Sequence, residues 1–143
     1  MTAPRACTFC AIVAGEVPAT RVLEDDGFVA FLDVRPLFPG HTLLVPREHV
    51  EVLTELPAPG VGPLFERARV LAGAMETGLG AQGSFVALNN RVSQSVPHLH
   101  VHVVPRTKGD GLRGFFWPRT KYASDSEAAD VAARLRGAVS AAR

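Results

Sequence analysis

Residues 98–104 read His98-Leu-His100-Val-His102-Val-Val104. Imidazole and aliphatic side chains alternate with a period of two, which predicts a β-strand with three histidines on one face and aliphatic residues on the other. Desolvated imidazoles need hydrogen-bond or metal partners, so a sheet face with three of them indicates chemistry rather than a plain core surface.

Two kinds of chemistry compete for this strand. The outer histidines lie about 13 Å apart along an extended chain, so all three cannot easily bind one metal ion, although His100 and His102 could share a catalytic metal. In the other interpretation His100 is a nucleophile that attacks phosphorus, provided its second nitrogen is held by an acceptor. The polar loop Ser93-Gln94-Ser95 just upstream could donate to a phosphate, and the geometry favours this division of roles.

The remaining chain predicts an α+β fold in a single domain over residues 1–143. The first three strands follow one another without a crossover helix, so we expect a mostly antiparallel five-stranded sheet packed with two main helices. The predicted strands cover 21–24, 28–34, 41–45, 84–89 and 98–104. The predicted helices are short ones at 7–13 and 48–56, one with Leu64, Ala68, Leu71 and Met75 on its apolar face, and one at 124–143.

The C-terminal helix at 124–143 opens with Ser124 and Glu127 in capping-box spacing. We expect it to bury one apolar face, formed by Ala128, Val131, Leu135 and Val139. The polar and aromatic loop at 109–119 lines the active site or, more plainly, buries its aromatic side chains at a subunit interface.

Composition narrows the function classes. The chain has 143 residues with 15 basic and 14 acidic side chains, a balance that does not favour a nucleic acid partner. No run approaches the ~20 apolar residues of a membrane helix, and we expect a cytoplasmic protein without a membrane partner.

Cys7 and Cys10 have the spacing of a zinc half-site. In a reducing cytosol such a pair is more often metal-binding or redox-active than a structural disulfide. A closed tetrahedral zinc site needs two further ligands, for which His49 and His98 are the candidates. A thioredoxin-like redox pair and two inert buried thiols remain the alternatives, the first disfavoured because no strand precedes Cys7.

Three segments together resemble one family. The run Gln94-Ser-Val-Pro-His98-Leu-His100-Val-His102-Val-Val-Pro-Arg106 looks like the histidine triad signature, in which His-x-His-x-His is followed by apolar residues. The segment 7–18 resembles the family's opening helix, and 31–36 with 39–50 resembles its nucleotide-binding strands. The family consists of homodimeric nucleotidyl hydrolases and transferases that act on the α-phosphate of nucleotides.

The resemblance implies roles for individual residues. His100 would be the nucleophile that forms a nucleotidyl-histidine intermediate, with His102 beside the phosphate and leaving group and His41 as a supporting histidine. Asp33 would accept hydrogen bonds from both ribose hydroxyls, as a carboxylate can. Other residues would line the substrate: Ile12, Phe31, Leu32 and Leu43 around the base, Gln94 and Ser95 as donors at the phosphate, and Asn89 nearby. Family members with this C-x2-C pair bind a structural zinc ion through the residues matching Cys7, Cys10, His49 and His98.

The chain also departs from the family pattern. Ser93 stands where many members have glycine, and the segment 89–94 is shorter than usual, so Asn89 and Asn90 both resemble the polar residue near the substrate. The sequence thus predicts a hydrolase of purine nucleotide phosphoramidates or dinucleoside polyphosphates. The alternative is a zinc-stabilised nucleotide-binding adaptor with little turnover.

Overall fold

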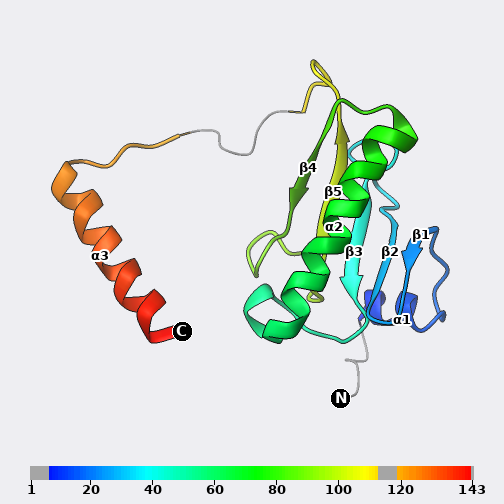
Figure 1. Ribbon diagram of the computed structural model, residues 1–143, viewed down its shortest axis with the longest axis horizontal. Helices are drawn as coiled ribbons and strands as arrows, with labels where there is room; N and C mark the ends of the chain where they lie inside the picture. The colour runs from blue at the N-terminus through cyan, green and yellow to red at the C-terminus, as the bar shows by residue number, and fades with distance from the viewer. Residues whose placement is uncertain (1–6, 113–118, 143) are drawn as a thin grey trace. The chain divides into compact units, whose positions relative to one another are not determined.

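The computed structural model describes residues 7–112 and 119–142. It forms two compact units, residues 1–110 and 111–143, and each is described by itself. The first unit contains a five-stranded sheet in the order β1-β2-β3-β5-β4, with every pair of neighbours antiparallel (Figure 1). The strands are β1 Arg21–Glu24, β2 Phe28–Leu32, β3 Thr42–Pro46, β4 Gly83–Ala87 and β5 Val101–Arg106. The predicted α+β class and antiparallel sheet are confirmed.

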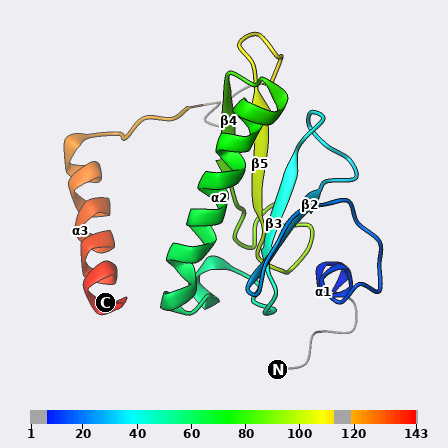
Figure 2. The ribbon, with the colours of Figure 1, turned by 45° about the vertical axis from the view of Figure 1, so that its right-hand side comes forward.

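Helices cover both faces of the sheet (Figure 2). Helix α2 (Ala58–Leu79) packs its predicted apolar residues, Leu64, Ala68, Leu71 and Met75, against one face. Helix α1 (Thr8–Val13) packs Phe9 and Ile12 against the other face. Alternation along the strands divides the residues between the two clusters: in β2, Phe28 and Ala30 face α2, whereas Val29 and Phe31 face α1. Two apolar layers therefore enclose the central strands.

The histidine strand starts later than its sequence pattern predicts. β5 begins at Val101, so His98 and His100 precede the strand. The register pairs Leu44 with Val101, and extending it would set Pro46 opposite Leu99. Proline has no N–H to continue the ladder there, and the N–H of Leu99 donates to the carbonyl of Val50 instead, at 2.7 Å.

The predicted helix over 48–56 is wrong. Only a 3-10 turn at Leu53–Glu55 forms, because Val50 uses its carbonyl on Leu99 rather than within a helix. Helix α2 begins next, at Ala58: Pro57 is its N-cap residue, and Pro59 lies in its first turn, which tolerates proline because its N–H would have no partner there. β2 ends at Leu32, two residues early, where the carboxylate of Asp33 accepts from the N–H of Arg35 and turns the chain.

Helix α3 (Asp125–Ala142) forms with the predicted cap, in which the hydroxyl of Ser124 accepts from the N–H of Glu127. Within its own unit it buries no described residue, and Leu135 and Val139 are exposed there, so the expected burial of its apolar face stays a prediction. An apolar stripe indicates that a helix packs against another surface, but it does not show which surface. Residues 113–118 of the predicted aromatic loop lie outside the described residues, and the single domain over 1–143 stays a prediction. No helix within the described ranges combines the length and apolar character needed to span a bilayer.

Candidate active site and metal centre

The imidazole of His100 is held in one tautomer. It is 4% exposed, and its Nδ1 lies 2.7 Å from the carbonyl oxygen of His98. A carbonyl only accepts, so Nδ1 carries the proton, and Nε2 of the neutral ring keeps a free lone pair. Burial lowers the pKa of His100, and the bond to His98 opposes this with a smaller effect. The net lowering favours the neutral ring at pH 7. This arrangement suits a nitrogen nucleophile.

His41 and His102 form a second, linked pair of imidazoles. The N–H of Leu37 donates to Nδ1 of His41 at 3.0 Å, and Nε2 of His41 lies 2.9 Å from Nδ1 of His102. Since Nδ1 of His41 accepts, its Nε2 is the protonated atom and donates to His102. His102 then accepts at Nδ1 and carries its own proton at Nε2. The backbone of Leu37 thus sets the tautomers of two histidines in succession.

Burial also keeps this pair neutral. It lowers the pKa of His41, and it lowers that of His102 to about 4, with His100 and His41 adding to the effect. The carboxylate of Asp33 opposes both shifts; its Oδ2 lies 3.7 Å from Nε2 of His41. At neutral pH His102 is therefore a hydrogen-bond donor through Nε2 and not a cation.

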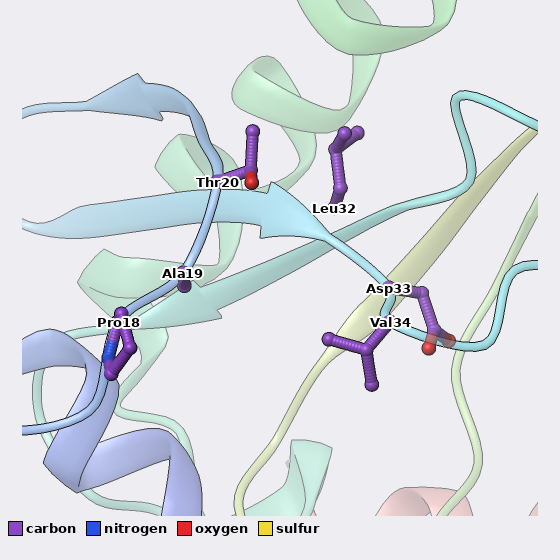
Figure 3. A pocket seen from close by; sticks show the side chains of 6 residues that line it. All are labelled: Pro18, Ala19, Thr20, Leu32, Asp33 and Val34. Carbon is purple, nitrogen blue, oxygen red and sulfur yellow. The ribbon is translucent and has the colours of Figure 1, made fainter.

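Asp33 and Leu32 line an open hollow of about 390 Å³ with Pro18, Ala19, Thr20 and Val34 (Figure 3). Ile12, Phe31 and Leu43 are instead buried together in the cluster under α1. Leu32 is the next residue after Phe31 in the strand and turns to the opposite side. The structure therefore brings three of the four predicted base-contacting residues together and sets the fourth at the rim of the hollow.

The predicted phosphate-side residues lie on the loop before His98. Ser95 and Asn89 are exposed. Gln94 uses its side chain within the protein: its oxygen accepts from the N–H of Arg91 at 2.8 Å, and its nitrogen donates to the carbonyl of Glu51 at 2.6 Å. One amide hydrogen of Gln94 remains for another acceptor.

The four predicted zinc ligands converge in one cluster, Cys7, Cys10, His49 and His98. Nδ1 of His98 lies 3.4 Å from each sulfur, and Nδ1 of His49 lies 3.2 Å from both Nδ1 of His98 and Sγ of Cys10. Around a tetrahedral zinc ion, nitrogen–nitrogen edges measure about 3.3 Å and nitrogen–sulfur edges about 3.6 Å. The cluster therefore has nearly the dimensions of a closed four-ligand site.

The chemistry of the donors fits a cation as well. Nε2 of His98 donates to the carbonyl of Pro46 at 2.9 Å, so the inward Nδ1 carries no proton, and burial lowers the pKa of this ring to about 4. Burial and the adjacent Cys7 raise the pKa of Cys10 to about 12, so without a cation this thiol stays protonated. A bound metal would release that proton. These four residues could therefore hold a metal ion.

A second group, Asp33, His41 and His102, also lies within ligating distance. Its two imidazoles already share a hydrogen bond, and His100 belongs to neither group found in the described part of the chain. The geometry therefore favours a nucleophilic role for His100 over that of a metal ligand.

Phe9 is a site residue that the sequence reasoning did not single out. Its ring meets those of His100 at 5.0 Å, Phe31 at 5.3 Å and His98 at 6.0 Å, each edge to face. It therefore stands between the metal cluster, the nucleophile and the apolar cluster under α1. The available signal was its position: Phe9 is a large apolar residue between Cys7 and Cys10, so it lies close to whatever those two residues contact.

In this antiparallel sheet alternating histidines lead into β5, and the buried His100 lies beside the hydrogen-bonded pair His41 and His102, which is the arrangement expected of a histidine triad protein. The chain belongs to the histidine triad family: the model of the HIT domain matches residues 14–109. The family prediction is thus confirmed.

Known relatives agree with this placement. A HIT-like protein of Mycobacterium tuberculosis is 40% identical over 108 residues, which cover 74% of this chain and 75% of that protein. An adenylylsulfatase of Arabidopsis thaliana is 32% identical over 108 residues (74% and 55%), and an adenosine 5′-monophosphoramidase of Schizosaccharomyces pombe is 32% identical over 114 residues (78% and 83%). The predicted enzyme class, hydrolase, is confirmed.

Solved structures share the fold. A Streptococcus mutans protein superposes with a TM-score of 0.86 at 32% identity, covering 96% of this chain and 87% of that one. A zinc-bound histidine triad family protein from Mycobacterium smegmatis superposes with a TM-score of 0.72 at 38% identity, covering 93% and 97%.

Proposed function

We propose that this enzyme hydrolyses purine nucleotide conjugates, nucleoside phosphoramidates or dinucleoside polyphosphates, at the α-phosphate and through a nucleotidyl-His100 intermediate. The observation that carries the proposal is the 2.7 Å bond from Nδ1 of His100 to the carbonyl of His98, which leaves Nε2 as a nucleophile. The names of the plant and fission yeast relatives, an adenylylsulfatase and an adenosine monophosphoramidase, support an adenylyl group as the transferred part.

In the first step Nε2 of His100 attacks the α-phosphorus and forms a phosphorus–nitrogen bond. The bond to the leaving group breaks with its electron pair, and the leaving group takes a proton from solvent where its basicity requires one. Nε2–H of His102 donates to the phosphoryl oxygen or the leaving group, and His41 holds that donor in place. Water then attacks the same phosphorus and loses a proton to solvent. The phosphorus–nitrogen bond breaks with its electron pair returning to Nε2 of His100, and the nucleoside monophosphate leaves.

The surrounding residues bind and orient the nucleotide in this proposal. Asp33 accepts from the ribose hydroxyls, with Leu32 beside it at the rim of the hollow. Ile12, Phe31 and Leu43 form the apolar side of the base site, and Ser95, Gln94 and Asn89 lie toward the phosphate. A nucleotide-soaked crystal tests each of these contacts.

We propose zinc as the metal of the four-residue cluster, supported by its two sulfur and two nitrogen donors and by the zinc-bound mycobacterial structure. A site with four protein ligands has no open position, so the metal would stabilise the fold and tie α1 to the start of β5. The catalytic steps then belong to the side chains of the chain itself.

Pre-steady-state kinetics with an adenosine phosphoramidate test the proposed function. We expect a burst of the leaving amine and an adenylylated His100 that can be trapped by acid quench and located by mass spectrometry. His100→Ala should give no adduct and a loss of at least about 10³-fold in kcat, as for other removed nucleophiles. Full turnover by His100→Ala would overturn the mechanism, and tight nucleotide binding without turnover would indicate the adaptor function instead.

We further propose that the enzyme acts in the cytoplasm as a homodimer. The support is the resemblance to a family of homodimers and the pair of thiols, which suits a reducing compartment. Light scattering coupled to size-exclusion chromatography measures the assembly: a mass of one chain at micromolar concentration would contradict the dimer.

A further inference from the structure

The loop between β4 and His98 contains two residues in an unfavourable backbone conformation. Arg91 has φ 70° and Ser93 has φ 60°, and neither is glycine. Side chains other than glycine, asparagine and aspartate seldom adopt this left-handed region, so neighbouring contacts must hold the turn in place. The strained turn lies immediately before Gln94 and Ser95, which face the phosphate in the proposed function.

Two side chains of the loop also bind one short segment outside it, residues 50–53. The side-chain oxygen of Asn90 accepts from the N–H of Leu53 at 2.9 Å. The side-chain nitrogen of Gln94 donates to the carbonyl of Glu51 at 2.6 Å. Two amide side chains thus tie the two ends of the strained turn to the same support.

The support itself is fixed in place. Val50 is buried, and its carbonyl accepts from the N–H of Leu99, between the metal-cluster residue His98 and the nucleophile. The N–H of Glu51 donates to the carboxylate of Glu55 at 2.9 Å, which closes the turn at Leu53–Glu55. The segment therefore binds Asn90, Gln94 and Leu99, while His49 just before it belongs to the cluster of four candidate metal ligands.

We propose that Asn90 is a positioning residue, whose side-chain oxygen anchors the strained turn 91–93 to Leu53 and so holds Ser95 at the phosphate. The role needs only an acceptor at Oδ1; the amide nitrogen of Asn90 takes no part in it. A substrate-contacting asparagine would instead use its amide hydrogens on phosphate oxygens. This inference rests on the proposed function for its kinetic consequence but not for the anchoring contact.

Asn90→Asp and Asn90→Ala separate these roles, because aspartate keeps the acceptor and lacks the donor. With an adenosine phosphoramidate we expect Asn90→Ala to lower kcat about tenfold with KM changed less than twofold, and Asn90→Asp to stay within about threefold of wild type. Val92→Ala, an exposed change in the same turn, serves as the matched control and should leave both constants unchanged.

Amide hydrogen exchange supplies the readout that does not depend on turnover. The N–H of Leu53 should exchange at least about tenfold faster in Asn90→Ala and at the wild-type rate in Asn90→Asp. If Asn90→Asp loses as much kcat as Asn90→Ala while Leu53 stays protected, Asn90 contacts substrate and the proposal fails. It also fails if Asn90→Ala leaves both exchange and kcat unchanged. If no variant and no wild-type protein turns over the phosphoramidate, the proposed function fails, whereas the exchange rates still decide the anchor.

Discussion

The hydrogen bonds from Leu37 to His41 and from His41 to His102 lead us to expect different outcomes for two substitutions of His41, His41→Gln and His41→Asn. The side-chain nitrogen of Gln occupies about the position of Nε2 in His, so His41→Gln keeps a donor for His102. Asn is shorter, and its oxygen occupies about the position of Nδ1, so His41→Asn keeps the acceptor for Leu37 and leaves His102 without its donor.

The size of the effect follows from burial. His41 is 3% exposed, so water cannot readily replace it at Nδ1 of His102. Leaving a buried acceptor unsatisfied costs about 1–3 kcal/mol, and freeing His102 to adopt the other tautomer removes Nε2–H from the phosphate. We expect His41→Asn to lower kcat/KM for an adenosine phosphoramidate about 30-fold, which corresponds to about 2 kcal/mol, and His41→Gln to lower it less than about fivefold.

Two measurements complete the assay. Nitrogen-15 NMR of His102 should report protonated Nε2 in wild type and His41→Gln and a mixture of tautomers in His41→Asn. Leu37→Ala keeps the backbone N–H and serves as the control, with unchanged kinetics expected because this side chain is 52% exposed. Equal losses in the Asn and Gln variants, or a larger loss in Gln, would show that the donor to His102 does not matter.

Three further predictions concern stability. Burial lowers the pKa of His102 to about 4, so between pH 4 and 6.5 the unfolded chain binds more protons than the folded one. The free energy of unfolding should therefore fall as pH falls through this window, by on the order of 1–2 kcal/mol for this group. A His102→Asn variant titrated in parallel should lack that part of the slope. Ser93→Gly relieves a φ of 60° and should raise the free energy of unfolding in urea by about 0.5–1 kcal/mol, whereas a loss would contradict the strain assigned to this turn. Elemental analysis should find one metal per chain. Cys7→Ser should clearly lower the melting temperature while changing the rate of the adenylylation step little, because the metal would act on stability. Metal-free protein of unchanged stability would contradict the structural role of the cluster.

Local patterns were enough to predict much of the fold. The spacing of Leu64, Ala68, Leu71 and Met75 identified the face of α2 that packs on the sheet, and the first three strands pair in succession as expected without a crossover helix. The errors arose where a partner distant in sequence decides the outcome. Pro46 ends the ladder opposite Leu99, and the bond from Leu99 to Val50 replaces a helix.

The candidate site divides in the same way. Residue type and spacing were enough to suggest Cys7, Cys10 and two histidines as one cluster, because few residues can complete a zinc half-site. Spacing could not show that Leu37 fixes the tautomer of His41, since that depends on how the loop before β3 folds back on it. It also could not show that Ser93 stands at the family's glycine position with the backbone of a glycine, which only the φ angle reveals.

His98 has a practical consequence for anyone who prepares this enzyme. Its ring belongs to the metal cluster, while its carbonyl oxygen orients His100. If the cluster holds zinc as we propose, chelators in a buffer or nickel leaching from an affinity column would act on the ring and thereby on the carbonyl that orients His100. Specific activities from different purifications would then be comparable only after metal content has been matched, and an inactive batch would call for a metal assay before any doubt about the substrate.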